Sequence, residues 1–179
     1  MIIDYQRVLT VILFLSLKIF QISSAQAQED VSISWTKLIG TLDFDVGLGV
    51  TLLRDGSIYT TGYTQGNLDG ETNLGSSDAF LSKYSSDGIR VWTKLIGSST
   101  ADVGWGVSAG NEENIYIIGS TSGNLDGETN AGSFDAFLSK YSSDGTRVWT
   151  KLIGTSNLER GYRSSISNDG SIYITGYTA

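Results

Sequence analysis

The sequence predicts an all-β fold made of repeated four-stranded antiparallel sheets. The hexapeptide Trp-Thr-Lys-Leu-Ile-Gly occurs three times without change, beginning at Trp35, Trp92 and Trp149, so the repeat has a constant length of 57 residues. A fixed period of this size is typical of architectures in which one supersecondary unit packs on the next. Each period also contains short segments rich in β-branched and aromatic residues, separated by turn residues and without helical periodicity.

The first complete unit, residues 49–97, shows the pattern. Asp55-Gly56 and Asp87-Gly88 supply the positive φ that tight turns between strands require. We expect strands over 50–53, 58–63, 79–84 and 90–96, turns at 54–57 and 85–88, and a polar loop over 65–78.

The second unit, residues 106–154, repeats this order, and a partial third unit covers 163–179. Glu113 stands where the first unit has Gly56, so we expect Asn111 or Asn114 to take the left-handed conformation in this turn. The expected strands of these units cover 107–109, 115–119, 136–141, 147–153, 165–167 and 172–177, with a loop over 123–135.

The strands are apolar on both faces. In the fourth strand of the first unit, Trp92 and Ile96 fall on one face, and Val91 and Leu95 fall on the other. A sheet of this kind has to be covered on both sides, as the stacked blades of a β-propeller are. A β-solenoid is the alternative repeat fold, but its coils are shorter and lack Asp-Gly hairpins.

An additional copy of the fourth strand, over 31–39, precedes the first blade. A single leading strand would close a propeller ring by completing a blade begun at the other terminus. We therefore predict that residues 28–179 form a β-propeller segment that is a fragment of a larger ring. Its unpaired blade edges would promote self-association.

Residues 1–27 predict a secretory signal peptide. Arg7 provides a positive charge ahead of the apolar run 8–17, and Ala25-Gln26-Ala27 offers a small-x-small cleavage site. The run is shorter than the roughly 20 residues that a membrane span needs, a retained anchor being the alternative. We expect a secreted, periplasmic or cell-surface protein with no membrane span after cleavage.

The composition excludes several kinds of chemistry. The chain has no Cys and no His, which removes disulfides, thiol nucleophiles, Ser-His-Asp triads and the commonest metal ligand. The net charge of −7 argues against nucleic acid as a partner, because polyanions select basic surfaces.

The repeat resembles the SBBP repeat, the "seven-bladed β-propeller" module of exported bacterial proteins. The residues that carry the resemblance are Asp78 to Tyr84 (DAFLSKY), Asp87-Gly88, Trp92, Asp45-x-Gly47-x-Gly49-Val50 and Asp55 to Gly62, with counterparts in the second unit at Asp135 to Tyr141, Asp144-Gly145, Trp149, Asp102-x-Gly104-x-Gly106-Val107 and Ile115 to Gly119. The resemblance implies a propeller fold and export, and it implies no common enzymatic activity.

The polar loop is the candidate metal site. Oxygen side chains at alternate positions around a glycine suit Ca²⁺, which accepts irregular oxygen cages. The alternative is a polar turn that caps its own backbone. The candidate ligands are Asn67, Asp69, Glu71, Asn73 and Asp78 in the first unit, and Asn124, Asp126, Glu128, Asn130 and Asp135 in the second.

A set of acids recurs once per unit, and a set of aromatic residues is expected near the loops. Asp45, Asp102 and Glu159 stand two residues before a glycine, and we interpret them as loop caps and not as a glycosidase pair, since one acid per unit places successive copies a blade apart. The aromatic residues Tyr63, Trp105 and Tyr162 are expected to pack between blades, or else to form a platform for a sugar or a protein.

No catalytic residue is identified. We therefore expect a non-enzymatic scaffold or protein-interaction module without a cofactor other than the candidate Ca²⁺. A carbohydrate-binding or carbohydrate-processing propeller is the alternative, so the expected partner is a protein or a glycan.

Overall fold

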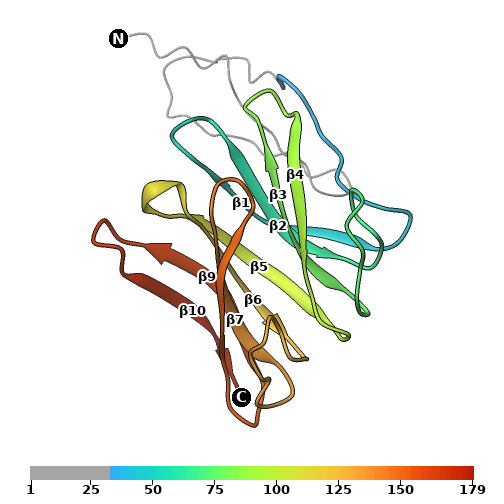
Figure 1. The fold of residues 1–179 in the computed structure, drawn as a ribbon, viewed down its shortest axis with the longest axis vertical. Coiled ribbons are helices and arrows are strands. Elements are labelled where there is room, and N and C mark those ends of the chain that lie inside the picture. Colours follow the sequence, from blue (N-terminus) through green and yellow to red (C-terminus); the bar gives the residue numbers. More distant parts are fainter. Residues whose placement is uncertain (1–32) are drawn as a thin grey trace, which may run out of the picture.

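The structure is a computed structural model that describes residues 33–179. Ten strands form three antiparallel sheets arranged one after another (Figure 1). The first sheet contains β1 (Asp45–Leu52), β2 (Ile58–Thr64), β3 (Asp78–Tyr84) and β4 (Arg90–Ile96) in sequence order. The second contains β5 (Asp102–Ala109), β6 (Ile115–Thr121), β7 (Asp135–Tyr141) and β8 (Arg147–Ile153), and β9 (Glu159–Ile166) with β10 (Ile172–Thr178) forms the third.

The predicted four-stranded blades are confirmed. Each complete sheet is a meander in which every strand pairs with the next along the chain, and the pairings of the second sheet repeat those of the first. The first strands of the sheets, β1, β5 and β9, lie next to one another in space. This is the arrangement of successive propeller blades around a common axis, with the first strand innermost. We refer to the three sheets as blades 1, 2 and 3.

The innermost strands are longer than predicted. β1 begins at Asp45, whereas the expected strand began at Val50. A β-bulge between Gly47 and Gly49 keeps the strand paired with β2 through a segment whose glycines resemble a loop in the sequence. The same bulge recurs between Gly104 and Gly106 in β5.

The strand predicted over 31–39 does not form in the part of that segment that the structure describes. Residues 33–40 belong to no strand, and residues 31 and 32 lie outside the described part, as does the predicted signal peptide. Trp35 nevertheless makes the same contact as its equivalent in the fourth strand of blade 1. Trp35 Nε1 donates to the Ser86 carbonyl at 3.2 Å, as Trp92 Nε1 donates to the Ser143 carbonyl at 3.3 Å. The segment therefore packs like a fourth strand without a described neighbour with which to form a ladder.

The main core lies between blades 1 and 2. Tyr59, Leu81 and Ile96 of blade 1 pack with Ile117 and Phe137 of blade 2. A second cluster joins Ile39 of the leading segment to blade 1, and a third joins blade 2 to Ile166 and Ile172 of blade 3. Burial of apolar side chains at these junctions is the main favourable contribution to the folding free energy of a repeat of this kind.

Candidate binding site

Five carboxylates stand at the first residues of β1, β3, β5, β7 and β9, all at one end of the blades. Each accepts a hydrogen bond from the backbone N–H four residues earlier. The pairs are Asp45 with Thr41 (2.6 Å), Asp78 with Leu74 (2.9 Å), Asp102 with Ser98 (2.7 Å), Asp135 with Ala131 (2.9 Å) and Glu159 with Thr155 (2.9 Å). The loop-capping interpretation of Asp45, Asp102 and Glu159 is confirmed by these bonds.

Two of these carboxyls meet at the junction of blades 1 and 2. A parallel bridge pairs Ser77 with Ala101, and the Asp102 N–H donates to the Ser77 carbonyl at 2.8 Å, which brings Asp78 and Asp102 side by side. Burial raises the pKa of Asp102. Burial also raises the pKa of Asp78, and the neighbouring Asp102 charge adds to that rise. The arrangement stabilises the loops at the cost of desolvating two acids.

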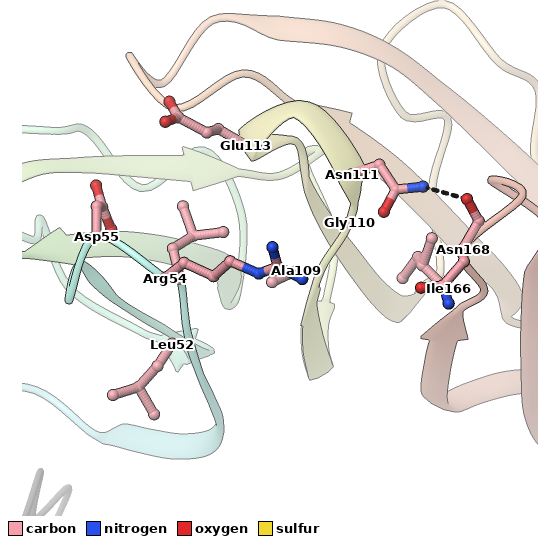
Figure 2. Close-up of a pocket in the computed structure, with 10 residues that line it drawn as sticks. Leu52, Arg54, Asp55, Ala109, Gly110, Asn111, Glu113, Ile166 and Asn168 are labelled. Atoms are coloured by element: carbon pink, nitrogen blue, oxygen red, sulfur yellow. Dashed lines mark hydrogen bonds between the residues drawn. The ribbon is translucent and has the colours of Figure 1, made fainter.

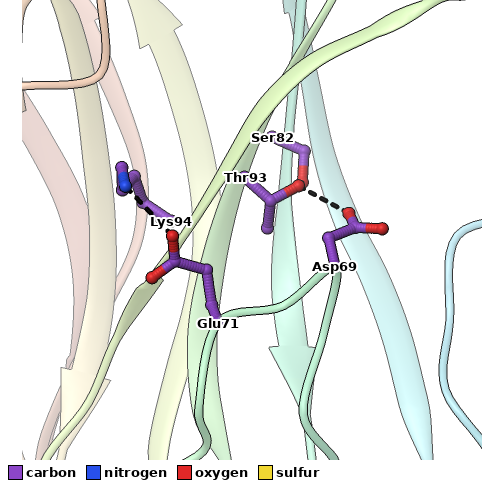
Figure 3. Close-up of polar contacts among 5 residues, drawn as sticks. All are labelled: Asp69, Glu71, Ser82, Thr93 and Lys94. Atoms are coloured by element: carbon purple, nitrogen blue, oxygen red, sulfur yellow. Dashed lines mark hydrogen bonds and ion pairs between the residues drawn. The ribbon is translucent and has the colours of Figure 1, made fainter.

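The polar loop of blade 1 is held by side-chain contacts to its own blade (Figure 3). Thr93 Oγ1 donates to Asp69 Oδ2 at 2.6 Å, and Lys94 Nζ lies 3.0 Å from Glu71 Oε1. Asn67 Oδ1 accepts from the Asn73 N–H at 3.0 Å. Asp69 and Gly70 both have positive φ, which makes the tight turn.

Blade 2 repeats these contacts. Thr150 Oγ1 donates to Asp126 Oδ2 at 2.6 Å, Lys151 Nζ lies 2.6 Å from Glu128 Oε1, and Asn124 Oδ1 accepts from the Asn130 N–H at 3.0 Å. Asp78 and Asp135, the other candidate ligands, cap Leu74 and Ala131. Within residues 33–179 no group of three or more acidic side chains gathers in a geometry suited to a metal ion. The structure does not test calcium binding, which stays one of two alternatives for these loops beside the self-capping polar turn.

Two of the three aromatic residues, Trp105 and Tyr162, stand at equivalent positions of the innermost strands, where the first unit has Leu48. Trp105 occupies the bulge of β5 and Tyr162 the bulge of β9, and their rings meet edge to face with centroids 5.6 Å apart. Trp105 Nε1 also donates to Ser120 Oγ at 3.0 Å. Tyr63 instead packs beside Phe44, at 6.1 Å between centroids. The Trp105–Tyr162 pair therefore packs between blades, as expected.

A pocket lies at the other end of the blades, where the turns after β1, β5 and β9 come together. We call it the turn pocket; its volume is about 510 Å³, and it is lined by Leu52, Leu53, Arg54, Asp55, Ala109, Gly110, Asn111, Glu113, Ile166 and Asn168. Figure 2 shows the Arg54 side chain extending toward Ala109 at the end of β5. Asn111 Nδ2 donates to the Asn168 carbonyl at 2.9 Å and so links blades 2 and 3 at the pocket.

The second turn of the pocket is strained. The expectation that Asn111 or Asn114 takes the left-handed conformation is wrong, because Glu113 has a φ of 60°. The short 3₁₀ segment Asn111–Glu113 and a bond from Asn114 Nδ2 to the Asn111 carbonyl, 2.9 Å long, hold it there. A non-glycine residue in this region costs on the order of 1 kcal/mol, and such strain concentrates at functional positions.

The acids of the pocket already have partners. Asp55 accepts from the N–H and the hydroxyl of Ser57, both at 2.8 Å, and these bonds lower the pKa of Asp55. Glu113 Oε2 accepts from Ser143 Oγ at 3.2 Å. Arg54 is exposed and forms no hydrogen bond or ion pair with any described residue.

None of the pocket residues was among the sequence-predicted site residues. The available signal is the second turn, which reads Asn-Glu-Glu-Asn at 111–114, whereas the first and third read Arg-Asp-Gly-Ser at 54–57 and Asn-Asp-Gly-Ser at 168–171. By contrast, β3 and β7 are identical, and so are β4 and β8.

Comparisons with known proteins support the repeat architecture. The chain is 23% identical over 187 residues to a WD repeat-containing protein of Acanthamoeba polyphaga mimivirus and 27% identical over 157 residues to the regulatory protein FlaEY of Caulobacter vibrioides. These alignments cover 83% and 79% of the chain but only 14% and 16% of those proteins. No family model matches the chain, so SBBP membership stays a resemblance. No helix among residues 33–179 is long and apolar enough to cross a membrane. The chain is an all-β repeat protein whose sheets are arranged as propeller blades.

Proposed function

We propose that this chain is a non-enzymatic, exported repeat protein that binds another protein at the turn pocket. The observation that carries the proposal is the position of the turns. Three consecutive repeats bring their equivalent turns around one pocket, and the turn at 111–114 differs from the Asp-Gly-Ser turns on either side of it, while strands β3 and β4 are copied without change in β7 and β8. In repeat proteins a constant framework commonly presents variable residues to a partner.

Two features of the pocket support this assignment. Polar and charged groups surround Leu52, whose side chain is 56% exposed, and mixed lining of this kind is typical of protein-binding surfaces. Glu113 also takes a φ of 60° at the place where Gly56 of blade 1 has a φ of 84°, so a strained non-glycine residue stands where glycine would adopt the turn without strain. The similarity to a WD repeat-containing protein supports the same general class, because WD repeats are propeller repeats.

Site-specific cross-linking tests the proposal. A photoreactive residue at Asn111, on the pocket rim, is expected to form an adduct with a protein from the envelope and secreted fraction of the producing cells. The matched control is the same residue at Ser99, which is exposed at the opposite end of the blades. The adduct is identified by mass spectrometry and its binding is repeated with purified protein. Equal adducts at both positions, or none at Asn111, would contradict the proposal.

Carbohydrate binding is the second candidate, and the half-buried Trp105–Tyr162 pair is the feature that favours it. Aromatic side chains with one polar end suit sugar rings as well as protein surfaces. A glycan array separates the two functions, because protein binding at the turn pocket predicts a blank array. A positive array that Trp105→Ala abolishes would favour the carbohydrate function.

A further inference from the structure

We infer that Arg54 is the anchor of the turn pocket and that it binds a carboxylate of an extended peptide segment. This inference rests on the proposed function, since it names the part of the partner that the same pocket would recognise. It depends on three observations: the guanidinium has no partner among the side chains that the structure describes, the two acids of the lining are occupied, and the lining combines apolar with polar side chains.

The guanidinium of Arg54 is a strong donor that has no acceptor among the side chains described in the structure. Figure 2 shows its side chain extended between the first turn and Ala109, apart from both acids of the lining. Arginine presents five N–H donors in a rigid fork that matches the two oxygens of a carboxylate. A carboxylate from outside the described chain is the simplest group that would complete it.

The acids of the pocket do not serve this purpose. Asp55 is tied to Ser57 by two hydrogen bonds within its own turn, and Glu113 bonds Ser143 of blade 2. The equivalent arginines that begin β4 and β8 are paired with acids, since Arg90 lies 3.3 Å from Asp69 and Arg147 pairs with Asp126. Arg163 donates to the Trp105 and Tyr162 carbonyls, and Arg160 lies over the Phe134 ring. Each complete blade therefore supplies an acid for the arginine that begins its fourth strand, whereas Arg54 has no acid partner among the described residues.

The rest of the lining favours a peptide. Leu52 and Ile166 offer apolar contact on opposite sides of Arg54, and the Asn168 side-chain amide makes no bond to a described residue. An extended peptide can present apolar side chains, backbone N–H and C=O groups, and a carboxylate together. Asp55 and Glu113 make the same pocket unfavourable for a polyanion, which argues against nucleic acid.

The inference can be tested by an NMR titration of the full chain, following the Arg54 Nε–H and Asn111 side-chain amide signals. The probe is an acetylated and amidated hexapeptide of alanine and leucine with one central glutamate. Comparison ligands are the same peptide with glutamine, the glutamine peptide with a free C-terminal carboxylate, and sodium acetate. We expect both carboxylate peptides to shift the two signals, the glutamine amide and acetate to have much less effect, and added NaCl to weaken binding.

Variants of Arg54 complete the test. Arg54→Gln is expected to weaken binding of the glutamate peptide by about tenfold or more, because it removes a charged hydrogen-bonding group. The affinity of Arg54→Lys for the glutamate peptide should lie between those of the unchanged protein and Arg54→Gln, since lysine keeps the charge and loses the paired N–H donors of the guanidinium. The matched control is Arg90→Gln, which removes an arginine outside the pocket and should leave peptide binding unchanged. Circular dichroism confirms that each variant is folded.

Equal binding of the glutamate and glutamine peptides, unchanged binding by Arg54→Gln, or acetate binding as tight as the peptide would each overturn the inference. Failure of the carboxylate peptides to bind would overturn it as well. If the Asn111 cross-link persists in that case, the proposed protein-binding function stands and only the anchor is wrong.

Discussion

Strands β2 and β10 have nearly the same sequence and opposite environments. They read Ile-Tyr-Thr-Thr-Gly-Tyr-Thr and Ile-Tyr-Ile-Thr-Gly-Tyr-Thr, so that only Thr60 and Ile174 differ. In β2 every side chain except one is buried, whereas in β10 six of the seven residues are exposed. Both strands pair with the strand before them in the same register, including the bulge. The difference therefore comes from neighbours and not from local sequence.

The neighbours of the two strands explain the contrast. β2 pairs with β3 on its other edge and lies in a blade packed against blade 2, whereas β10 ends its sheet. The same effect separates two identical strands. Ile96 of β4 is 2% exposed at the junction of blades 1 and 2, and Ile153 of β8 is 48% exposed beside blade 3. In this architecture the junction between blades, more than the blade itself, is the unit of burial.

The largest predicted effect compares the two tyrosines of these strands. Tyr59 is fully buried and packs edge to face on Trp92 at 5.8 Å, whereas Tyr173 is 64% exposed. Tyr59→Ala should lower the free energy of unfolding by about 3–5 kcal/mol, the usual loss for a buried aromatic residue. Tyr173→Ala should lower it by less than about 1 kcal/mol. Urea unfolding followed by tryptophan fluorescence measures both, and equal losses would contradict the comparison.

The next effect concerns the buried carboxyl of Asp102. Asp102→Ala removes the acceptor of the Ser98 N–H and should cost about 1–3 kcal/mol, the penalty for leaving a buried donor unsatisfied. Asp102→Asn keeps an acceptor oxygen and should cost less. A loss as large for Asn as for Ala would show that the charge, and not the acceptor, matters.

Asp102 also predicts a pH dependence. Burial raises the pKa of this carboxyl in the folded state above its ordinary value of 3.8, so the ionised form is disfavoured by folding. The folded protein consequently binds the proton first as the pH falls, and the penalty is relieved between the raised pKa and about pH 4. Asp102 should thus add stability on mild acidification, and Asp102→Asn should flatten that gain in melting curves recorded from pH 7 to pH 4.

A smaller effect compares two turn glycines. Gly145 and Gly170 have φ values of 88° and 85°, but a Cβ on Gly145 would come within 3.1 Å of the Trp92 ring, whereas nothing lies within 4 Å at Gly170. Gly170→Ala should cost about 1 kcal/mol for the backbone alone. Gly145→Ala should cost more, because Trp92 has to move. Unfolding curves that show the same loss for both would indicate that the Trp92 contact with this turn is unimportant.

The smallest effect concerns the polar loops. The contacts of Asp69 with Thr93 and of Glu71 with Lys94 account for these side chains without a metal. We expect the melting temperature to be the same with about 1 mM CaCl₂ and after treatment with excess EDTA. A lower melting temperature in EDTA that Asp69→Asn abolishes would instead establish a calcium loop.

Much of the fold follows from the repeat itself. Asp-Gly turns and β-rich segments locate β2, β3 and β4 within a residue or so, because local turn chemistry and strand composition agree there. The start of β1 was missed because Gly47 and Gly49 suggest a loop, whereas pairing with β2 tolerates them through a bulge. The prediction of a strand over 31–39 failed for the described residues 33–39 because a ladder needs a neighbouring strand, which local sequence does not supply.

The site was less predictable than the fold. Asp45, Asp102 and Glu159 were predicted as caps because they recur at a fixed place in each repeat, whereas Asp78 and Asp135, which cap in the same way, were assigned to the candidate calcium loops. The turn pocket was not, because its residues lie about one repeat apart and meet only through blade stacking. The strained φ of Glu113 is likewise accompanied by contacts that no local propensity indicates, the bond from Asn114 to the Asn111 carbonyl and the bond from Ser143 to Glu113.

Hydrogen–deuterium exchange of the native chain compares β2 and β10 most directly. If blade neighbours determine protection, the amides of residues 58–64 should exchange at rates set by global unfolding, while those of 172–178 should exchange many times faster. The two segments are nearly identical, so their intrinsic exchange rates are closely matched. Equal protection of the two strands would contradict the account, because local strand sequence would then be enough to stabilise a blade.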